Sequence, residues 1–256
     1  MDRENRKLLY FSFEAGACAR GHRFGRVKLP LMEIGIGEEG KLVGCLVPEY
    51  DRGKRAWEEK RLTDCLDAVI HAIPCEEYYL QPEVAGLVGV EERFPPEALL
   101  QCLLQQVPCM EYLYCIGWEE GTQRLRELLE PYFPRINHVS VVSDKPEEYE
   151  WFGEYLYMDY GTPLSCAPRL EANLGREGRT VILDGKRDYN IPWQAFPKGA
   201  VYVDIWSVEG KRQLLEKRRQ DAKYLSIVKF LDTTMKSGYN TRVNYTVCRK
   251  GLRRQS

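Results

Sequence analysis

The stretch 180–206, TVILDGKRDYNIPWQAFPKGAVYVDIW, contains two short apolar and β-branched runs that each lead into an aspartate. The runs have the length and composition of buried strands, and their aspartates are Asp184 and Asp204. The loop 185–199 between them combines prolines, aromatic residues and charges of both signs. Such a loop is typical of the rim of a sheet, where binding sites concentrate.

Upstream of this stretch, helical and extended patterns alternate. Apolar spacing and β-branched runs predict helix 95–107, strand 112–117, helix 122–133, strand 138–143, helix 145–160 and strand 164–167. Strands separated by helices of this length require parallel pairing, because each crossover returns the chain to the same edge of the sheet. The sequence therefore predicts an α/β fold with a doubly wound, mostly parallel, Rossmann-like sheet in residues 76–256.

The two ends of the chain add further predicted elements. After the quoted stretch, the pattern predicts a long helix over 208–235 and a last strand over 241–247. Residues 7–47 contain three strand-like runs that predict an antiparallel meander, and an apolar stripe predicts helix 57–73. We therefore expect residues 1–75 to form a small N-terminal antiparallel β-rich unit.

The composition indicates a cytoplasmic globular protein with no membrane segment. Of the 256 residues, 44% are apolar and 29% are charged, and no apolar run approaches the ~18 residues that a membrane span needs. The first residues contain no apolar leader. Nine scattered cysteines without a Cys-x-x-Cys pair predict reduced, largely buried side chains and no metal site.

Three aspartates follow predicted strands, at the edge where an open parallel sheet binds its ligands. Asp144 has capping-box spacing with Glu147, so we expect its carboxylate to bond to helix amides. Asp184 precedes a glycine and is also suited to a turn, whereas a buried Asp204 would require a partner. Converging carboxylates at this edge are suited to Mg²⁺ or to ribose hydroxyl groups.

A cation in the predicted helix 208–235 is a candidate partner for these acids. Arg218 falls on the apolar side of that helix, so its guanidinium must reach solvent or meet an anion, either a sheet aspartate or a ligand phosphate. A buried ion pair with Asp204 would make the stretch 180–206 a scaffold, and an open arrangement would make it a site. The candidate ligand-binding residues are Asp184, Arg187, Trp193, Asp204 and Arg218.

The turn 116–122, IGWEEGT, lies between a predicted strand and a predicted helix, where amides can bind a phosphate. Neither Gly-x-Gly-x-x-Gly nor Gly-x-x-x-x-Gly-Lys-Ser/Thr is present, and Glu119 and Glu120 repel an anion there. We therefore predict no phosphate site at this turn. No nucleophile motif occurs, and with three histidines in the chain a serine or cysteine hydrolase is disfavoured.

Two functions remain, and the residues define neither a reaction nor a cofactor. The first is binding of a phosphate-bearing or nucleotide small molecule at the carboxyl edge of the sheet. The alternative is a non-enzymatic interaction protein whose basic C-terminal helix docks an acidic partner or nucleic acid, because residues 207–256 carry 13 Lys and Arg against 4 Asp and Glu. A pI near 6.4 disfavours nucleic acid.

Overall fold

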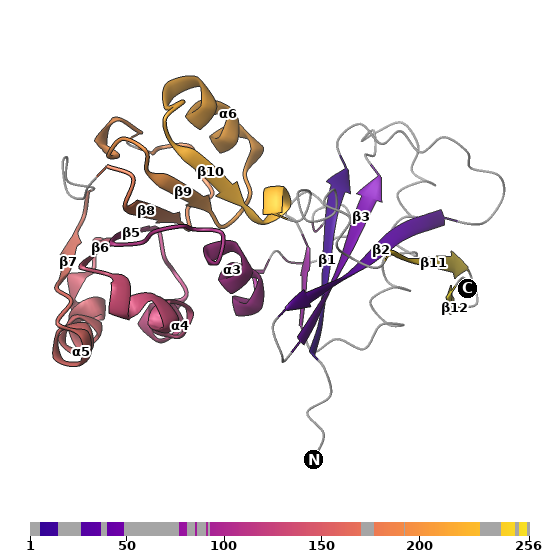
Figure 1. Ribbon diagram of the computed structural model, residues 1–256, viewed down its shortest axis with the longest axis horizontal. Helices are drawn as coiled ribbons and strands as arrows, with labels where there is room; N and C mark the ends of the chain where they lie inside the picture. Colours follow the sequence, from indigo (N-terminus) through magenta and orange to yellow (C-terminus); the bar gives the residue numbers. More distant parts are fainter. Residues whose placement is uncertain are drawn as a thin grey trace, which may run out of the picture. The chain divides into compact units, whose positions relative to one another are not determined.

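Residues Glu97–Phe230 form a unit around a six-stranded sheet in which all neighbouring strands are parallel (Figure 1). Its strands are β5 (Tyr112–Ile116), β6 (His138–Val142), β7 (Leu164–Ala167), β8 (Thr180–Asp184), β9 (Val201–Asp204) and β10 (Lys223–Ser226). Their order is β10-β9-β8-β5-β6-β7. The chain therefore starts in the middle, moves outward to β7, and then returns to the other side of β5. The prediction of an α/β fold with a parallel sheet is confirmed.

The structure is a computed structural model. It describes residues 6–14, 27–36, 40–48, 77–80, 85, 91, 93–169, 177–191, 193–230, 242–248 and 251–254. The predicted helix 57–73 lies outside the described residues. Among the described helices, none has both the length and the apolar character needed to cross a membrane.

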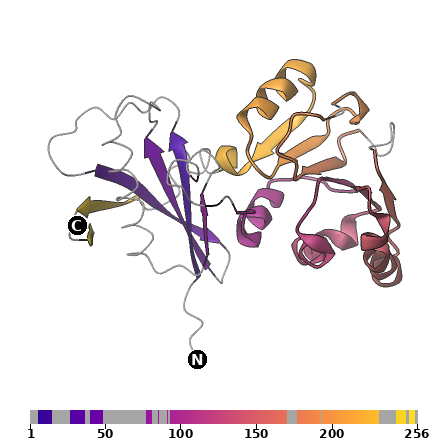
Figure 2. The same ribbon diagram turned by 180° about the vertical axis from the view of Figure 1, so that it is seen from behind.

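Helices cover both faces of the parallel sheet. In both views α3 (Glu97–Leu104), α4 (Gly121–Leu129) and α5 (Glu150–Tyr160) lie on one side, and α6 (Glu209–Arg218) lies on the other (Figures 1 and 2). Every residue of β8 and β9 is buried as a result. This burial explains why both strands read as continuous apolar runs rather than as alternating ones.

Two predicted helices contain 3-10 segments. The predicted helix 122–133 is α-helical only as far as Leu129 and continues as η1 (Glu130–Arg135). Two prolines in η1 lack the amide proton that an α-helical ladder needs. The predicted helix 145–160 begins with η2 (Pro146–Tyr149) before α5. It ends, as predicted, at a glycine with positive φ, Gly161.

The predicted helix over 208–235 is wrong for residues 219–226, whereas residues 227–230 are helical again and residues 231–235 lie outside the described residues. The chain leaves α6 after Arg218, turns, and enters β10, which pairs in parallel with β9. The residues Tyr224 and Leu225 are buried in this strand. A strand that is covered on both faces carries consecutive apolar residues, and a short run of them also fits helical spacing.

The other unit joins Met1–Pro96 to Leu231–Ser256 and contains a second sheet. In the order β12-β11-β2-β3-β1-β4, its strands are β12 (Gly251–Arg254), β11 (Arg242–Cys248), β2 (Val27–Ile36), β3 (Gly40–Pro48), β1 (Arg6–Glu14) and β4 (Glu77–Leu80). Strands β2 and β3 are antiparallel as predicted, but β1 pairs with β3 in parallel, so a simple antiparallel meander is wrong. The predicted last strand, β11, pairs with β2 and not with the parallel sheet.

Candidate functional site

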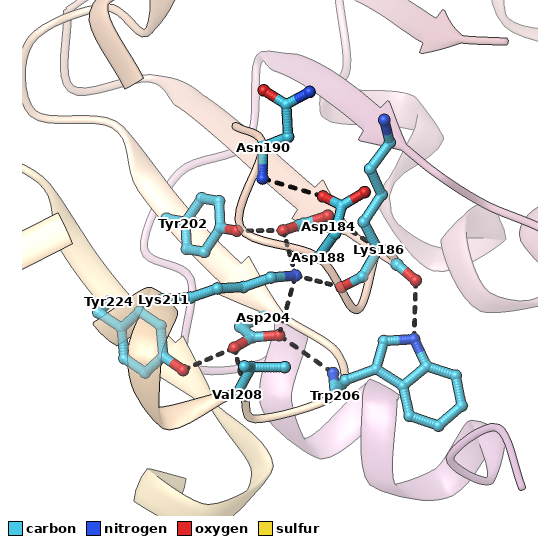
Figure 3. Close-up of polar contacts among 11 residues, drawn as sticks. Asp184, Lys186, Asp188, Asn190, Tyr202, Asp204, Trp206, Val208, Lys211 and Tyr224 are labelled. Carbon is cyan, nitrogen blue, oxygen red and sulfur yellow. Dashed lines mark hydrogen bonds and ion pairs between the residues drawn. The ribbon is translucent and has the colours of Figure 1, made fainter. Parts of the chain in front are cut away.

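A buried cluster of three charged side chains lies between the sheet and α6 (Figure 3). Asp184 and Asp204 end the neighbouring strands β8 and β9 in register, and both are 0% exposed. Lys211 of α6 is also 0% exposed, and its Nζ lies 2.7 Å from Asp184 Oδ2 and 3.8 Å from Asp204 Oδ1. Burying these charges is tolerated because each carboxylate faces the same ammonium.

Backbone and tyrosine donors complete the bonding of both carboxylates. Asp184 accepts hydrogen bonds from the Tyr202 hydroxyl and from the Lys186 amide at 2.9 Å. Asp204 accepts from the backbone amides of Trp206 and Val208, at 3.2 and 2.7 Å, and from the Tyr224 hydroxyl at 2.8 Å. With their acceptor positions occupied and no exposed surface, these aspartates stabilise the fold and do not face an open pocket.

The sequence of α6 places Lys211 inside the protein. Lys211 precedes Leu214 and Leu215 by three and four residues, so it lies on the same face of the helix. Leu215 is buried in a cluster that also contains Tyr202 and Tyr224. Packing of this face against the sheet therefore carries the lysine to the strand ends.

The structure separates the five predicted ligand-binding residues. Arg218, which was expected to reach solvent or to meet an anion, is exposed at the end of α6, because the helix stops there. Trp193 is buried in the core and packs against Tyr202. Arg187 is exposed and stacks on Trp206, with its Cζ 3.9 Å from the ring centroid. Only Asp184 and Asp204 lie together.

The neighbouring Arg219 fixes the loop between β8 and β9. Its guanidinium donates hydrogen bonds to the carbonyl oxygens of Trp193, Phe196 and Pro197 at 2.7–2.8 Å. Asp221 pairs with the same guanidinium at 2.8 Å, and this pairing lowers the pKa of the Asp221 carboxyl. The loop is thereby held by the residues that follow α6.

A cavity of about 650 Å³ lies at the carboxyl ends of β5, β6, β7 and β8. It borders β5 and β8, where the strand order of the sheet reverses, and open α/β sheets bind ligands at this position. None of the five predicted residues lines it. The lining residues are Gly117, Trp118, Glu119, Gly121, Thr122, Val142, Ser143, Asp144, Lys145, Glu148, Tyr149, Pro168 and Lys186.

Two glycines let the ends of β5 and β8 approach each other beside this cavity. A Cβ at Gly185 would lie 2.6 Å from the carbonyl oxygen of Gly117. Gly117 has a φ of 61°, and a Cβ there would meet the Lys186 side chain. The Gly185 amide donates to the Ile116 carbonyl at 2.8 Å, which places Lys186 against the cavity.

Three lining charges have no ionic partner within the part of the chain that the structure describes: Lys186, Glu119 and Asp144. Figure 3 shows the Lys186 ammonium directed away from the buried cluster. Lys145 pairs with Glu148 at 3.0 Å. The predicted capping role of Asp144 is wrong. Helix η2 has Lys145 at its N-cap position and no side-chain cap, and the Lys145 amide bonds instead to Ser143 Oγ at 3.1 Å.

Tyr149 and Trp118 hold one wall of the cavity in place. The Tyr149 hydroxyl donates to the Trp118 carbonyl at 3.2 Å, and Trp118 Nε1 donates to the Gly121 carbonyl at 2.8 Å. Burial raises the pKa of Tyr149 to about 12, so this phenol remains a neutral donor at physiological pH. The first turn of α4 is therefore tied through Trp118 to the end of η2.

The described side chains were compared with the requirements of a metal site and of a disulfide bond. No group of three or more His, Cys, Asp or Glu side chains among them is arranged to hold a metal ion. Cys102, Cys109, Cys115 and Cys166 are free thiols. The lining of the candidate site combines charged and hydroxyl side chains with the apolar side chains of Trp118, Val142 and Pro168.

Comparison of the chain with family models, with curated proteins and with solved structures found no match. Function is therefore inferred from the position and chemistry of the cavity.

The buried cluster predicts a pH-dependent stability. Desolvation raises the pKa of Asp204 to about 6 from 3.8, although the charge of Lys211 opposes this shift. Between these values the folded state binds a proton that the unfolded state does not, so the contribution of Asp204 to stability falls as the pH rises from about 4 to about 6. Relative to an Asp204→Asn variant, the wild type should lose about 1–3 kcal/mol of unfolding free energy over this range.

Urea unfolding of both proteins at pH 4, 5, 6 and 7 measures this difference. The Asn variant loses hydrogen bonds at every pH, and this loss appears as a constant offset. A difference that stays constant, or that moves in favour of the wild type as the pH rises, would contradict the raised pKa.

Proposed function

We propose that this protein binds a phosphate-bearing or nucleotide small molecule in the cavity at the carboxyl edge of the parallel sheet. The observation that carries the proposal is the position of the cavity where the strand order reverses, with an unpaired ammonium, Lys186, in its lining. In this proposal, residues 97–230 are a doubly wound, Rossmann-like domain. The N-terminal strands belong to a separate β-rich unit.

The residues around the cavity fit an anionic group. The positive charge of Lys186 attracts an anion, and the absence of a Cβ at Gly117 leaves room for the Lys186 side chain. Helix α4 begins at the cavity, and its N-cap residue Glu120 makes no side-chain cap bond. Repulsion by Glu120 is reduced, because its carboxylate pairs with Arg124 at 2.5 Å.

The alternative of an interaction protein has less support. It required one basic helix over 208–235, but the chain leaves the helical conformation after Arg218 and forms β10. We therefore propose the small-molecule site alone.

Replacement of Lys186 with alanine tests this proposal. We expect titration calorimetry with inorganic phosphate and AMP to show binding to the wild type, and binding at least ~10-fold weaker to Lys186→Ala, because an unpaired ammonium opposite a phosphate contributes more than ~1 kcal/mol. Lys198→Ala is the matched control, because Lys198 is an exposed lysine of the same unit and does not line the cavity.

Two results would overturn the proposal. The first is an absence of binding to the wild type by phosphate and by AMP at millimolar concentration. The second is equal binding by the Lys186→Ala and Lys198→Ala variants.

A further inference from the structure

The charges that line the cavity restrict the kind of anion it accepts. Lys145 already pairs with Glu148, so one unpaired cation, Lys186, remains in the described lining. Two unpaired carboxylates, Glu119 and Asp144, lie in the same lining. A ligand with several phosphate groups would bring more negative charge than one lysine offsets, and it would lie near both acids.

Both unpaired carboxylates are exposed to solvent, and no side chain among the described residues donates a hydrogen bond to them. An ionised carboxylate accepts through two oxygens and cannot donate, so it matches a pair of adjacent hydroxyl groups. Asp144 follows β6, two residues after its last residue, and Lys186 follows β8. The single strand β5 separates them, so the two strand ends lie about 10 Å apart. When the side chains of Asp144 and Lys186 extend into the cavity, the remaining distance between the carboxylate and the ammonium suits one sugar ring with one phosphate group.

From this arrangement we infer that the ligand is a sugar that carries one phosphate group and a vicinal diol, either as a ribonucleoside monophosphate or as the sugar phosphate itself. Lys186 binds the phosphate and Asp144 accepts hydrogen bonds from the diol. Glu119 excludes additional phosphate groups by charge repulsion. This inference rests on the proposed function, because it names the ligand class of the same cavity.

Calorimetric titrations of the full chain with a small panel of ligands test the inference. The panel consists of inorganic phosphate, ribose 5-phosphate, AMP, 2′-deoxy-AMP, ADP and ATP. We expect AMP to bind 10- to 100-fold more tightly than 2′-deoxy-AMP, because the lost hydroxyl leaves a carboxylate without its donor. We also expect ATP to bind more weakly than AMP. Equal affinity for ribose 5-phosphate and AMP identifies the sugar phosphate as sufficient, and tighter binding of AMP shows that the base contributes.

The Asp144→Asn variant separates recognition of the diol from general binding. It should lose most of the preference for AMP over 2′-deoxy-AMP, because the amide keeps one acceptor oxygen but not the charge, while its affinity for inorganic phosphate should not fall below the wild-type value. Glu154→Gln is the control, because Glu154 is an exposed acid of α5 outside the cavity. Equal thermal unfolding of both variants and the wild type excludes misfolding as the cause.

The outcomes distinguish failure of this inference from failure of the proposed function. Wild-type protein that binds phosphate but shows no preference between AMP and 2′-deoxy-AMP, or that prefers ATP, overturns the ligand class and leaves the proposed function standing. Protein that binds no member of the panel overturns both.

Discussion

Replacing Lys211 with methionine is expected to lower the free energy of unfolding of the Glu97–Phe230 unit by about 3–5 kcal/mol. Methionine fills a similar volume but supplies no charge, so Asp184 and Asp204 would remain buried without a cation. The ammonium also donates a hydrogen bond to the Lys186 carbonyl, and this bond would be lost. Urea unfolding of the full chain, followed by tryptophan fluorescence, measures the change.

A control and a rescue make this prediction specific. Lys217→Met alters an exposed lysine of the same helix and should change stability by no more than ~0.5 kcal/mol. The double variant Asp184→Asn with Lys211→Met should lose at least ~1 kcal/mol less unfolding free energy than the sum of the losses of the two single variants. The reason is that Lys211→Met alone leaves two buried carboxylates without a cation, whereas the double variant leaves one. A loss below ~1 kcal/mol for Lys211→Met would show that the cluster is not a buried ion-pair network.

The sequence offered a buried ion pair as one of two alternatives for these aspartates, but it did not identify the residue that makes the pair. Two aspartates at strand ends and a cation on the apolar side of the next helix were both recognised, and Arg218 was chosen. Lys211 occupies the same face one turn before Leu214 and Leu215, so the signal was present. The choice depended on where the helix ends, and helix ends depend on tertiary pairing such as that of β10 with β9.

The cavity was harder to predict as an anion site, because the acidic residues near it argued against anion binding. Glu119 and Glu120 argued against an anion site at the turn 116–122, but a sequence does not show that Arg124 neutralises one of them. The capping-box spacing likewise assigned Asp144 to a helix terminus that begins one residue later. In the first case folding pairs Glu120 with Arg124, and in the second it leaves the Asp144 carboxylate without an ionic partner in the described residues.

Strand pairing in the other sheet shows a further limit of sequence patterns. The strands β1, β2 and β3 were recognised as strands, and the hairpin of β2 and β3 follows from the short glycine-rich connection between them. The parallel pairing of β1 with β3 and the pairing of β11 with β2 join residues far apart in the chain. Alternation of apolar residues indicates a strand but does not determine which strand it pairs with.

Replacing Gly185 with alanine is expected to destabilise the protein and to weaken ligand binding together. The new Cβ would lie 2.6 Å from the carbonyl oxygen of Gly117 and 3.2 Å from its carbonyl carbon. These are backbone atoms at the end of β5, so relief of the clash requires the two strand ends to move apart. Such movement would strain the hydrogen bond from the Gly185 amide to the Ile116 carbonyl and would displace Lys186 from the cavity. We expect a loss of about 1–3 kcal/mol in unfolding free energy.

Gly153→Ala is the matched control for this clash, because it adds the same methyl group at a glycine of α5 with no close backbone neighbour. Its Cβ would lie 3.6 Å from Leu164 Cβ, an ordinary contact, and alanine favours a helix over glycine by roughly 0.5–1 kcal/mol. That variant should therefore unfold at an unchanged or higher urea concentration and bind AMP as the wild type does. If Gly185→Ala matched it in both measurements, the approach of β5 and β8 would not position Lys186, and the phosphate would have to be bound by other groups in the cavity.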